Sequence, residues 1–118
     1  MVVNLAGPVA VLKRIADIWK VSDAELAIIL ACDSTHEARD IIEGRRGLLP
    51  PNQASRVRYL FSVHETLSEL LRDEKAEARW LRRRSRDLGG LTPLEVLLRG
   101  RIEGILRVKH FANRCVGR

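Results

Sequence analysis

The amino-acid sequence predicts an all-α protein built from short helices. Only five of the 118 residues are aromatic, whereas 46% are hydrophobic, so the core has to consist of Leu, Ile, Val and Ala. Runs of β-branched residues are few, and 31% of the chain is charged. Both observations favour helices over sheet. A chain of this length forms one or two small domains.

The first and the longest expected helices each carry an apolar stripe at three- and four-residue steps. The first is expected to begin at Pro8, because proline lacks the N–H that would have no partner in a first turn. Its stripe consists of Val9, Leu12, Ile15, Ala16 and Trp19. The longest is expected over residues 53–72, after a loop with two glycines and two prolines at 44–52. Its stripe consists of Val57, Leu60, Phe61, His64, Leu67, Ser68 and Leu71.

Two short helices between these begin with the same signal, a capping box. Ser22 followed by Glu25 predicts a helix over about residues 23–31, and Ser34 followed by Glu37 predicts another that ends at Gly44. Two short helices joined by a tight turn are typical of the helix-turn-helix, but they are also a common packing unit without any role in DNA binding. Both interpretations stay open at this point.

In a helix-turn-helix, the exposed face of the second helix lies in the major groove of DNA. Asp40 and Glu43 share this face with its one arginine, which disfavours direct contacts to bases. Arginines in the flanking loop and helix start are suited to holding phosphates, which positions a protein without a sequence code. The candidate DNA-binding residues are Thr35, His36, Arg39, Arg45, Arg46 and Arg56.

The positive charge of the chain is concentrated in its C-terminal part. Residues 1–73 contain nine Lys or Arg against ten Asp or Glu, whereas residues 74–118 contain twelve against five. Four of these cations, Arg82, Arg83, Arg84 and Arg86, follow the end of an expected helix, where cations favour the negative end of the helix dipole. Stabilising the end of a helix does not require four arginines. Arginine side chains also bind carboxylates and phosphates, so this run is suited to docking onto an acidic protein surface or onto nucleic acid.

The most distinctive stretch is residues 80–96, WLRRRSRDLGGLTPLEV. Asp73 is expected to cap the helix that leads into it. A turn at Gly89 and Gly90 separates that helix from a second start signal, in which Thr92 supplies the cap and Pro93 the first turn, with Glu95 completing a capping box. A last helix then places Ile105, Val108, Ala112 and Cys115 on one face.

This stretch resembles the signature of the Xre/MbcA/ParS antitoxin family. Arg84 and Ser85 stand where a Pro-Asn pair is usual in the family. The resemblance implies a helix-turn-helix-like N-terminal helical domain over residues 1–72, followed by a small helical toxin-binding domain over residues 73–118. The matching residues are Trp80, Leu81, Leu88, Gly89, Gly90, Thr92, Pro93 and Leu94.

The function implied by this resemblance is that of an antitoxin in a type II toxin–antitoxin system. Its partner would be a RES-domain toxin that consumes NAD, inhibited by covering the NAD pocket, and the antitoxin would also repress its own operon. A homo-oligomer or a toxin–antitoxin hetero-oligomer is then expected. The candidate toxin-binding residues are Arg82, Arg83, Arg84, Arg86, Arg107, Lys109, His110, Arg114 and Arg118. The alternative is a stand-alone helix-turn-helix transcriptional regulator that binds DNA.

Other functional classes have little support in the sequence. No nucleophile motif or Gly-rich phosphate loop is present, so we expect neither an enzyme nor a cofactor. Cys32 and His36 are four residues apart without a second ligand pair, which disfavours a zinc site, and Cys32 and Cys115 are expected to be reduced thiols. His64 is expected to be an interior or interface histidine. Neither end resembles a secretory or membrane signal, so a cytoplasmic protein is expected.

Overall fold

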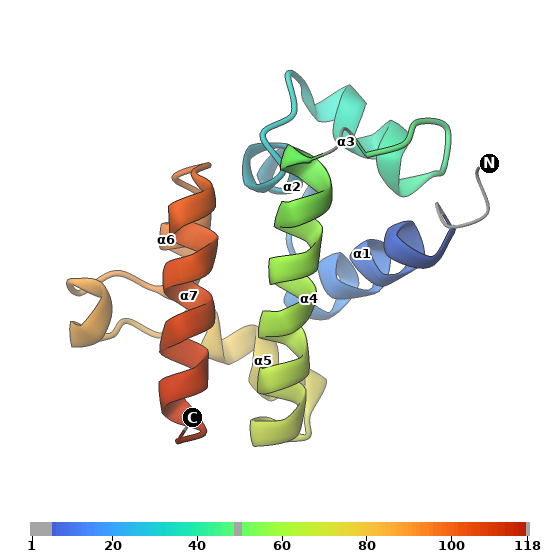
Figure 1. Ribbon diagram of the computed structural model, residues 1–118. Coiled ribbons are helices and arrows are strands. Elements are labelled where there is room, and N and C mark those ends of the chain that lie inside the picture. The colour runs from blue at the N-terminus through green and yellow to red at the C-terminus, as the bar shows by residue number, and fades with distance from the viewer. Residues whose placement is uncertain (1–5, 49–50, 118) are drawn as a thin grey trace.

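The protein is an arrangement of α-helices with one short 3-10 helix, η1, and no strand in the part that the structure covers (Figure 1). The structure is a computed structural model that describes residues 6–48 and 51–117. It confirms the predicted all-α class. The elements are α1 (Ala6–Trp19), α2 (Asp23–Ile29), α3 (Thr35–Ile42), α4 (Asn52–Leu71), α5 (Glu74–Trp80), η1 (Arg86–Leu88), α6 (Pro93–Leu97) and α7 (Ile102–Cys115).

The longest helix, α4, lies at the centre of the arrangement. It runs beside α7 in the same direction, and α1 crosses behind it (Figure 1). Helices α1 and α5 pack against each other and against α4, while α2 and α3 form a pair at one end of the molecule. The C-terminal elements are therefore assembled on the same central helix as the N-terminal ones.

Most predicted helix starts coincide with the observed ones because local capping sets them. Ser22 accepts a hydrogen bond from the Glu25 N–H, and the Glu25 carboxylate accepts one from the Ser22 N–H, which completes the capping box of α2. Asp73 caps α5 as predicted. Helix α1, however, begins at Ala6, two residues before the predicted start, so Pro8 lies within its first turn and not at its first position.

The capping box predicted for α3 forms only in part. Ser34 Oγ accepts a hydrogen bond from the Glu37 N–H at 3.1 Å. The Glu37 carboxylate instead accepts from the Asp33 N–H at 2.8 Å and pairs with Arg46 at 3.0 Å. Glu37 is buried, and its hydrogen bond from the Asp33 N–H holds the turn between α2 and α3. This bond replaces the one that the predicted capping box would form between the Glu37 carboxylate and the Ser34 N–H.

A single aliphatic core extends through the whole molecule. It includes Leu12 and Ile15 from α1, Leu60 and Leu67 from α4, and Ile105 from α7, all 2% exposed or less. Burial of each such side chain contributes about 1.5–3 kcal/mol to the free energy of folding. Three residues predicted on the buried faces, Phe61, Ser68 and Cys115, are exposed.

Candidate functional site

The residues of the distinctive stretch form a compact turn that carries η1. Helix α5 ends at Trp80, and the buried Leu81 accepts a backbone hydrogen bond from Leu94 at 2.9 Å, which closes the stretch on itself. Ser85 caps η1 through a hydrogen bond from the Asp87 N–H. Gly89 and Gly90 have φ angles of 68° and 84°, which other residues adopt with difficulty. The Gly-Gly pair is therefore required by the backbone that follows η1.

Helix α6 positions α7 at close range. Thr92 and Glu95 form the predicted capping box of α6, with Pro93 in its first turn. Gly104 of α7 lies against this helix, since a Cβ added there would be 2.8 Å from the Val96 carbonyl oxygen. Only glycine allows this separation, so Gly104 sets the distance between α6 and α7. The side chains on the outer face of α7 are thereby held beside η1.

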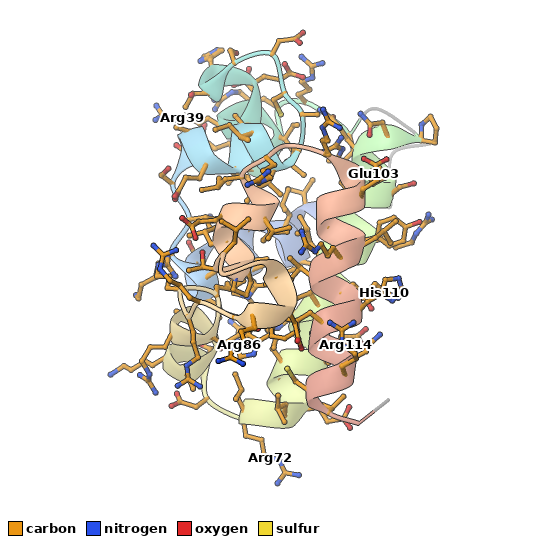
Figure 2. All side chains as sticks on the ribbon, turned by 90° about the vertical axis from the view of Figure 1, so that its left-hand side faces the viewer. Arg39, Arg72, Arg86, Glu103, His110 and Arg114 are labelled. Atoms are coloured by element: carbon orange, nitrogen blue, oxygen red, sulfur yellow. The ribbon has the colours of Figure 1, made fainter. Side chains whose placement is uncertain are left out.

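An open groove lies between η1 and α7. Its volume is about 560 Å³, and its lining consists of Asp87, Glu103, Leu106, Arg107, His110 and Arg114. Figure 2 looks onto this side of the molecule, where Glu103, His110 and Arg114 are spaced along α7 and Arg86 lies beside them. The groove thus brings together three of the predicted toxin-binding residues, Arg107, His110 and Arg114.

An aromatic pair supports one wall of this groove. The rings of Trp80 and Phe111 stack with their centroids 5.3 Å apart, which joins the end of α5 to α7. The guanidinium carbon of Arg114 lies 5.8 Å from the centroid of the Phe111 ring, and its Nη2 is 3.9 Å from Asp87 Oδ2. Arg114 is therefore oriented by a ring on one side and a carboxylate on the other, while its side chain stays exposed.

The four arginines that follow α5 divide into two pairs. Arg82 donates to the carbonyl oxygens of Ala78 and Lys20, and Arg84 donates to that of Gly90 and pairs with Glu95. Both therefore hold the turn in place. Arg83 and Arg86 are exposed, and no hydrogen bond or ion pair joins either side chain to another described residue. Of this run, Arg83 and Arg86 are the arginines whose side chains have no partner among the described residues.

Of the two remaining predicted toxin-binding residues, Lys109 is half-buried and does not line the groove. Arg118 lies outside the described residues. The sequence did not indicate η1, Asp87 or Leu106 as part of the site, although the pair of Ser85 and Asp87 has the spacing of a helix cap.

The predicted DNA-contact residues of α3 are exposed, but their charges are largely paired within the protein. Arg39 lies 3.1 Å from Asp23, and His36 lies 3.4 Å from Asp40. Arg45 bonds to both Asp40 and Glu43. The hydrogen bond from Arg45 lowers the pKa of Asp40, and the same bond raises the pKa of Arg45. Thr35 is exposed at the start of the helix. This end of the molecule therefore carries alternating, mutually compensated charges.

Arg56 does not lie on the surface where its sequence position suggested a phosphate contact. Its side chain is 7% exposed, and its guanidinium donates to the carbonyl oxygens of Ile29 and Gly100 at 3.0 and 2.9 Å. Burial lowers the pKa of Arg56. A buried guanidinium bonded to two backbone carbonyls cannot reach DNA, so Arg56 joins α2 to the start of α7 instead.

Several other side chains have a structural role. His64 is largely buried and its Nδ1 lies 2.6 Å from Glu77 Oε2, which confirms the predicted interior histidine. Burial raises the pKa of the Cys32 thiol to about 11. Within residues 6–48 and 51–117, no group of three His, Cys, Asp or Glu side chains is arranged to hold a metal ion. No helix in these ranges has the length and hydropathy needed to cross a bilayer.

The fold and the groove define a small helical domain with an open groove, beside which its last helix carries basic side chains. A comparison with protein families identifies it more closely, because residues 66–115 match the family model of the antitoxin Xre/MbcA/ParS C-terminal toxin-binding domain. The match confirms, for this segment of the chain, the resemblance that its motif indicated. The match begins inside α4 and ends with α7. Comparisons with curated proteins and with solved structures give no significant match.

Proposed function

We propose that this protein is an antitoxin that neutralises a partner toxin by docking the groove between η1 and α7 onto it. The observation that carries the proposal is the convergence of Arg107, His110 and Arg114 in one groove inside the segment that matches the toxin-binding family. Arg86 extends the basic surface next to it (Figure 2). Arginine forks bind carboxylates in paired geometry, so an acidic rim on the toxin fits this surface.

The toxin we propose is a NAD-consuming RES-domain enzyme, inhibited because the docked antitoxin covers its NAD pocket. Co-expression of the two proteins should restore growth and yield a complex that survives purification. The double variant Arg107→Glu/Arg114→Glu should lose neutralisation, since it reverses both groove arginines. The matched control Lys13→Glu/Arg58→Glu changes the net charge equally on exposed positions outside the groove. Equal loss in both variants, or failure to co-purify with any product of its operon, contradicts the proposal.

Repression of its own operon is the second part of the proposal, and α3 is the candidate contact. Thr35, His36 and Arg39 present exposed side chains on one short helix that follows another, which supports a role as a recognition helix. Arg39→Ala should then relax sequence preference, whereas Arg45→Ala should weaken binding to all sequences alike. Equal affinity for promoter and random DNA, with and without toxin, would leave α2 and α3 as a packing or oligomerisation unit.

A further inference from the structure

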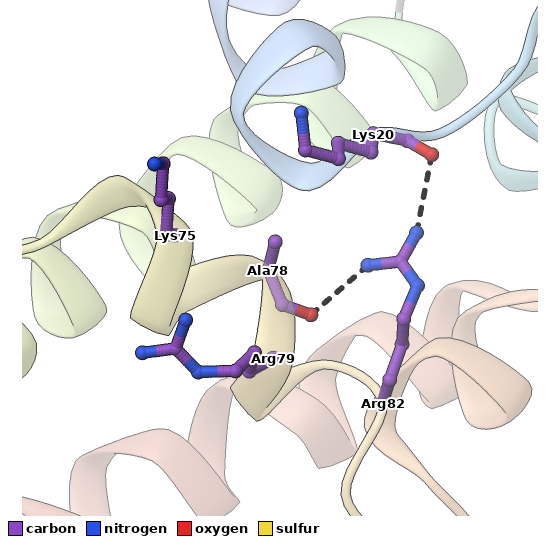
Figure 3. A pocket seen from close by; sticks show the side chains of 5 residues that line it. All are labelled: Lys20, Lys75, Ala78, Arg79 and Arg82. Carbon is purple, nitrogen blue, oxygen red and sulfur yellow. Dashed lines mark hydrogen bonds between the residues drawn. The ribbon is translucent and has the colours of Figure 1, made fainter.

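A second basic surface lies away from the groove, in a hollow between the end of α1 and α5. Its volume is about 580 Å³, and it is lined by Lys20, Lys75, Ala78, Arg79 and Arg82 (Figure 3). Four of these five residues are cationic. Ala78 is almost fully buried and forms part of the apolar floor. The hollow is therefore a basic rim around a small apolar base.

The cations of this hollow have little compensation within the protein. No hydrogen bond or ion pair joins the side chains of Lys20 or Lys75 to another described residue. Arg82 donates only to backbone carbonyl oxygens, so its charge faces no carboxylate at hydrogen-bond distance. Arg79 has one partner, Asp73, at 3.9 Å, and both side chains are mostly exposed. Such a pair is weak in water.

Hydrogen bonds from Arg82 to backbone carbonyl oxygens fix the shape of the hollow, and the side chains of the two lysines do not contribute to it. The carbonyl oxygen of Lys20 accepts a hydrogen bond of 3.1 Å from Arg82, and that of Ala78 accepts one of 2.9 Å (Figure 3). These bonds hold the end of α1 against α5 before any ligand binds. The backbone that lines the hollow is therefore pre-formed and needs no rearrangement to take up an anion.

From this arrangement we infer that the hollow binds the phosphodiester backbone of nucleic acid without reading its sequence. Protein surfaces interleave charges of both signs, as the end of the molecule around α2 and α3 does here with Arg39 beside Asp23 and Arg45 beside Asp40. Nucleic acid is a polyanion with charges of one sign throughout, and a cluster of cations with one weakly paired carboxylate at its edge matches it better. The apolar base suits the sugar that adjoins each phosphate. This inference is independent of toxin binding.

The test is the salt dependence of binding to a short, fluorescently labelled DNA duplex of random sequence, followed by anisotropy. Lys20→Gln/Lys75→Gln removes two cations whose side chains make no contact that the fold needs. The slope of log K against log salt should then fall by about 1.8, because each lost phosphate contact removes about 0.9. Lys13→Gln/Lys109→Gln is the matched control, with the same charge loss outside the hollow, and should keep the wild-type slope.

Three results would overturn the inference. The first is a slope that changes equally in both double variants, and the second is wild-type protein that does not bind the duplex at low salt. The third is a hollow variant that retains DNA binding but loses affinity for the toxin, which would make the hollow a docking site for an acidic protein. Toxin binding by the hollow variant, measured beside that of Arg107→Glu/Arg114→Glu, separates failure of this inference from failure of the proposed antitoxin function.

Discussion

The indole Nε1 of Trp19 donates a hydrogen bond of 2.6 Å to the carboxylate of Glu77, and so joins the end of α1 to α5. The same oxygen of Glu77 lies 2.6 Å from His64 Nδ1 on α4. Glu77 is 2% exposed, and a buried carboxylate is stable only where its oxygens are bonded. One acidic side chain therefore connects three helices, one of which belongs to the N-terminal part and another to the segment that matches the antitoxin family.

Replacing Glu77 should destabilise the whole protein. Glu77→Ala leaves the Trp19 N–H and the His64 ring nitrogen without partners in the core, which should lower the free energy of unfolding by about 2–4 kcal/mol. The control Glu74→Ala, in the same helix, removes an exposed pair with Arg14 and should cost less than about 1 kcal/mol. Urea unfolding followed by circular dichroism measures both, and similar costs would show that the buried contacts contribute little.

Much of the fold could be predicted because its helix starts depend on neighbouring residues. Ser22, Asp73 and Thr92 each cap a helix within three residues, so the sequence contains the whole interaction. The all-α class, the Gly-Gly turn and the family follow from similarly local patterns. Glu37 shows the limit of that reasoning, since its carboxylate bonds outside the predicted cap.

The candidate site was harder to predict because it depends on contacts between distant segments. Arg56 has the sequence neighbours of an exposed phosphate contact, but carbonyls 27 and 44 residues away bury it. Nothing in the sequence separates Arg82 and Arg84 from the rest of their run, yet both donate hydrogen bonds to backbone carbonyl oxygens. Which cations have partners is decided by tertiary structure, and the charge count alone does not contain that information.

Gly104→Ala should destabilise the protein, although alanine normally favours a helix over glycine by about 1 kcal/mol. The added Cβ would lie 2.8 Å from the Val96 carbonyl oxygen, so α6 and α7 would have to separate. Overpacking of this kind costs about 1–3 kcal/mol. Thermal unfolding reports the sign directly, and a melting temperature that rises on substitution would contradict the close approach of the two helices.

The two cysteines should differ strongly in their reactivity with a thiol reagent. Cys115 is exposed at the end of α7, whereas burial raises the pKa of Cys32 to about 11. The thiolate is the reactive form, so at pH 8 only about one Cys32 thiol in a thousand is ionised. Native protein should therefore react rapidly at one site, and the rate at Cys32 should increase as the pH approaches 11. Cys115→Ser, which leaves Cys32 alone, isolates the slow site, and rapid labelling of that variant at pH 8 would contradict the raised pKa.

Arg56→Gln should lower stability without changing the salt dependence of any DNA binding. The guanidinium donates to the carbonyl oxygens of Ile29 and Gly100, and glutamine is too short to reach both, so at least one buried acceptor loses its partner. The expected cost is about 1–3 kcal/mol in the free energy of unfolding. Because the group is buried, its loss removes no phosphate contact, and the slope of log K against log salt should stay at the wild-type value.

Arg45→Gln is the exposed counterpart, with little effect expected on stability because its ion pairs with Asp40 and Glu43 lie in water. A stable Arg56→Gln protein with a flattened salt slope would instead assign Arg56 to DNA contact, which requires the end of α2 and the start of α7 to open and release it.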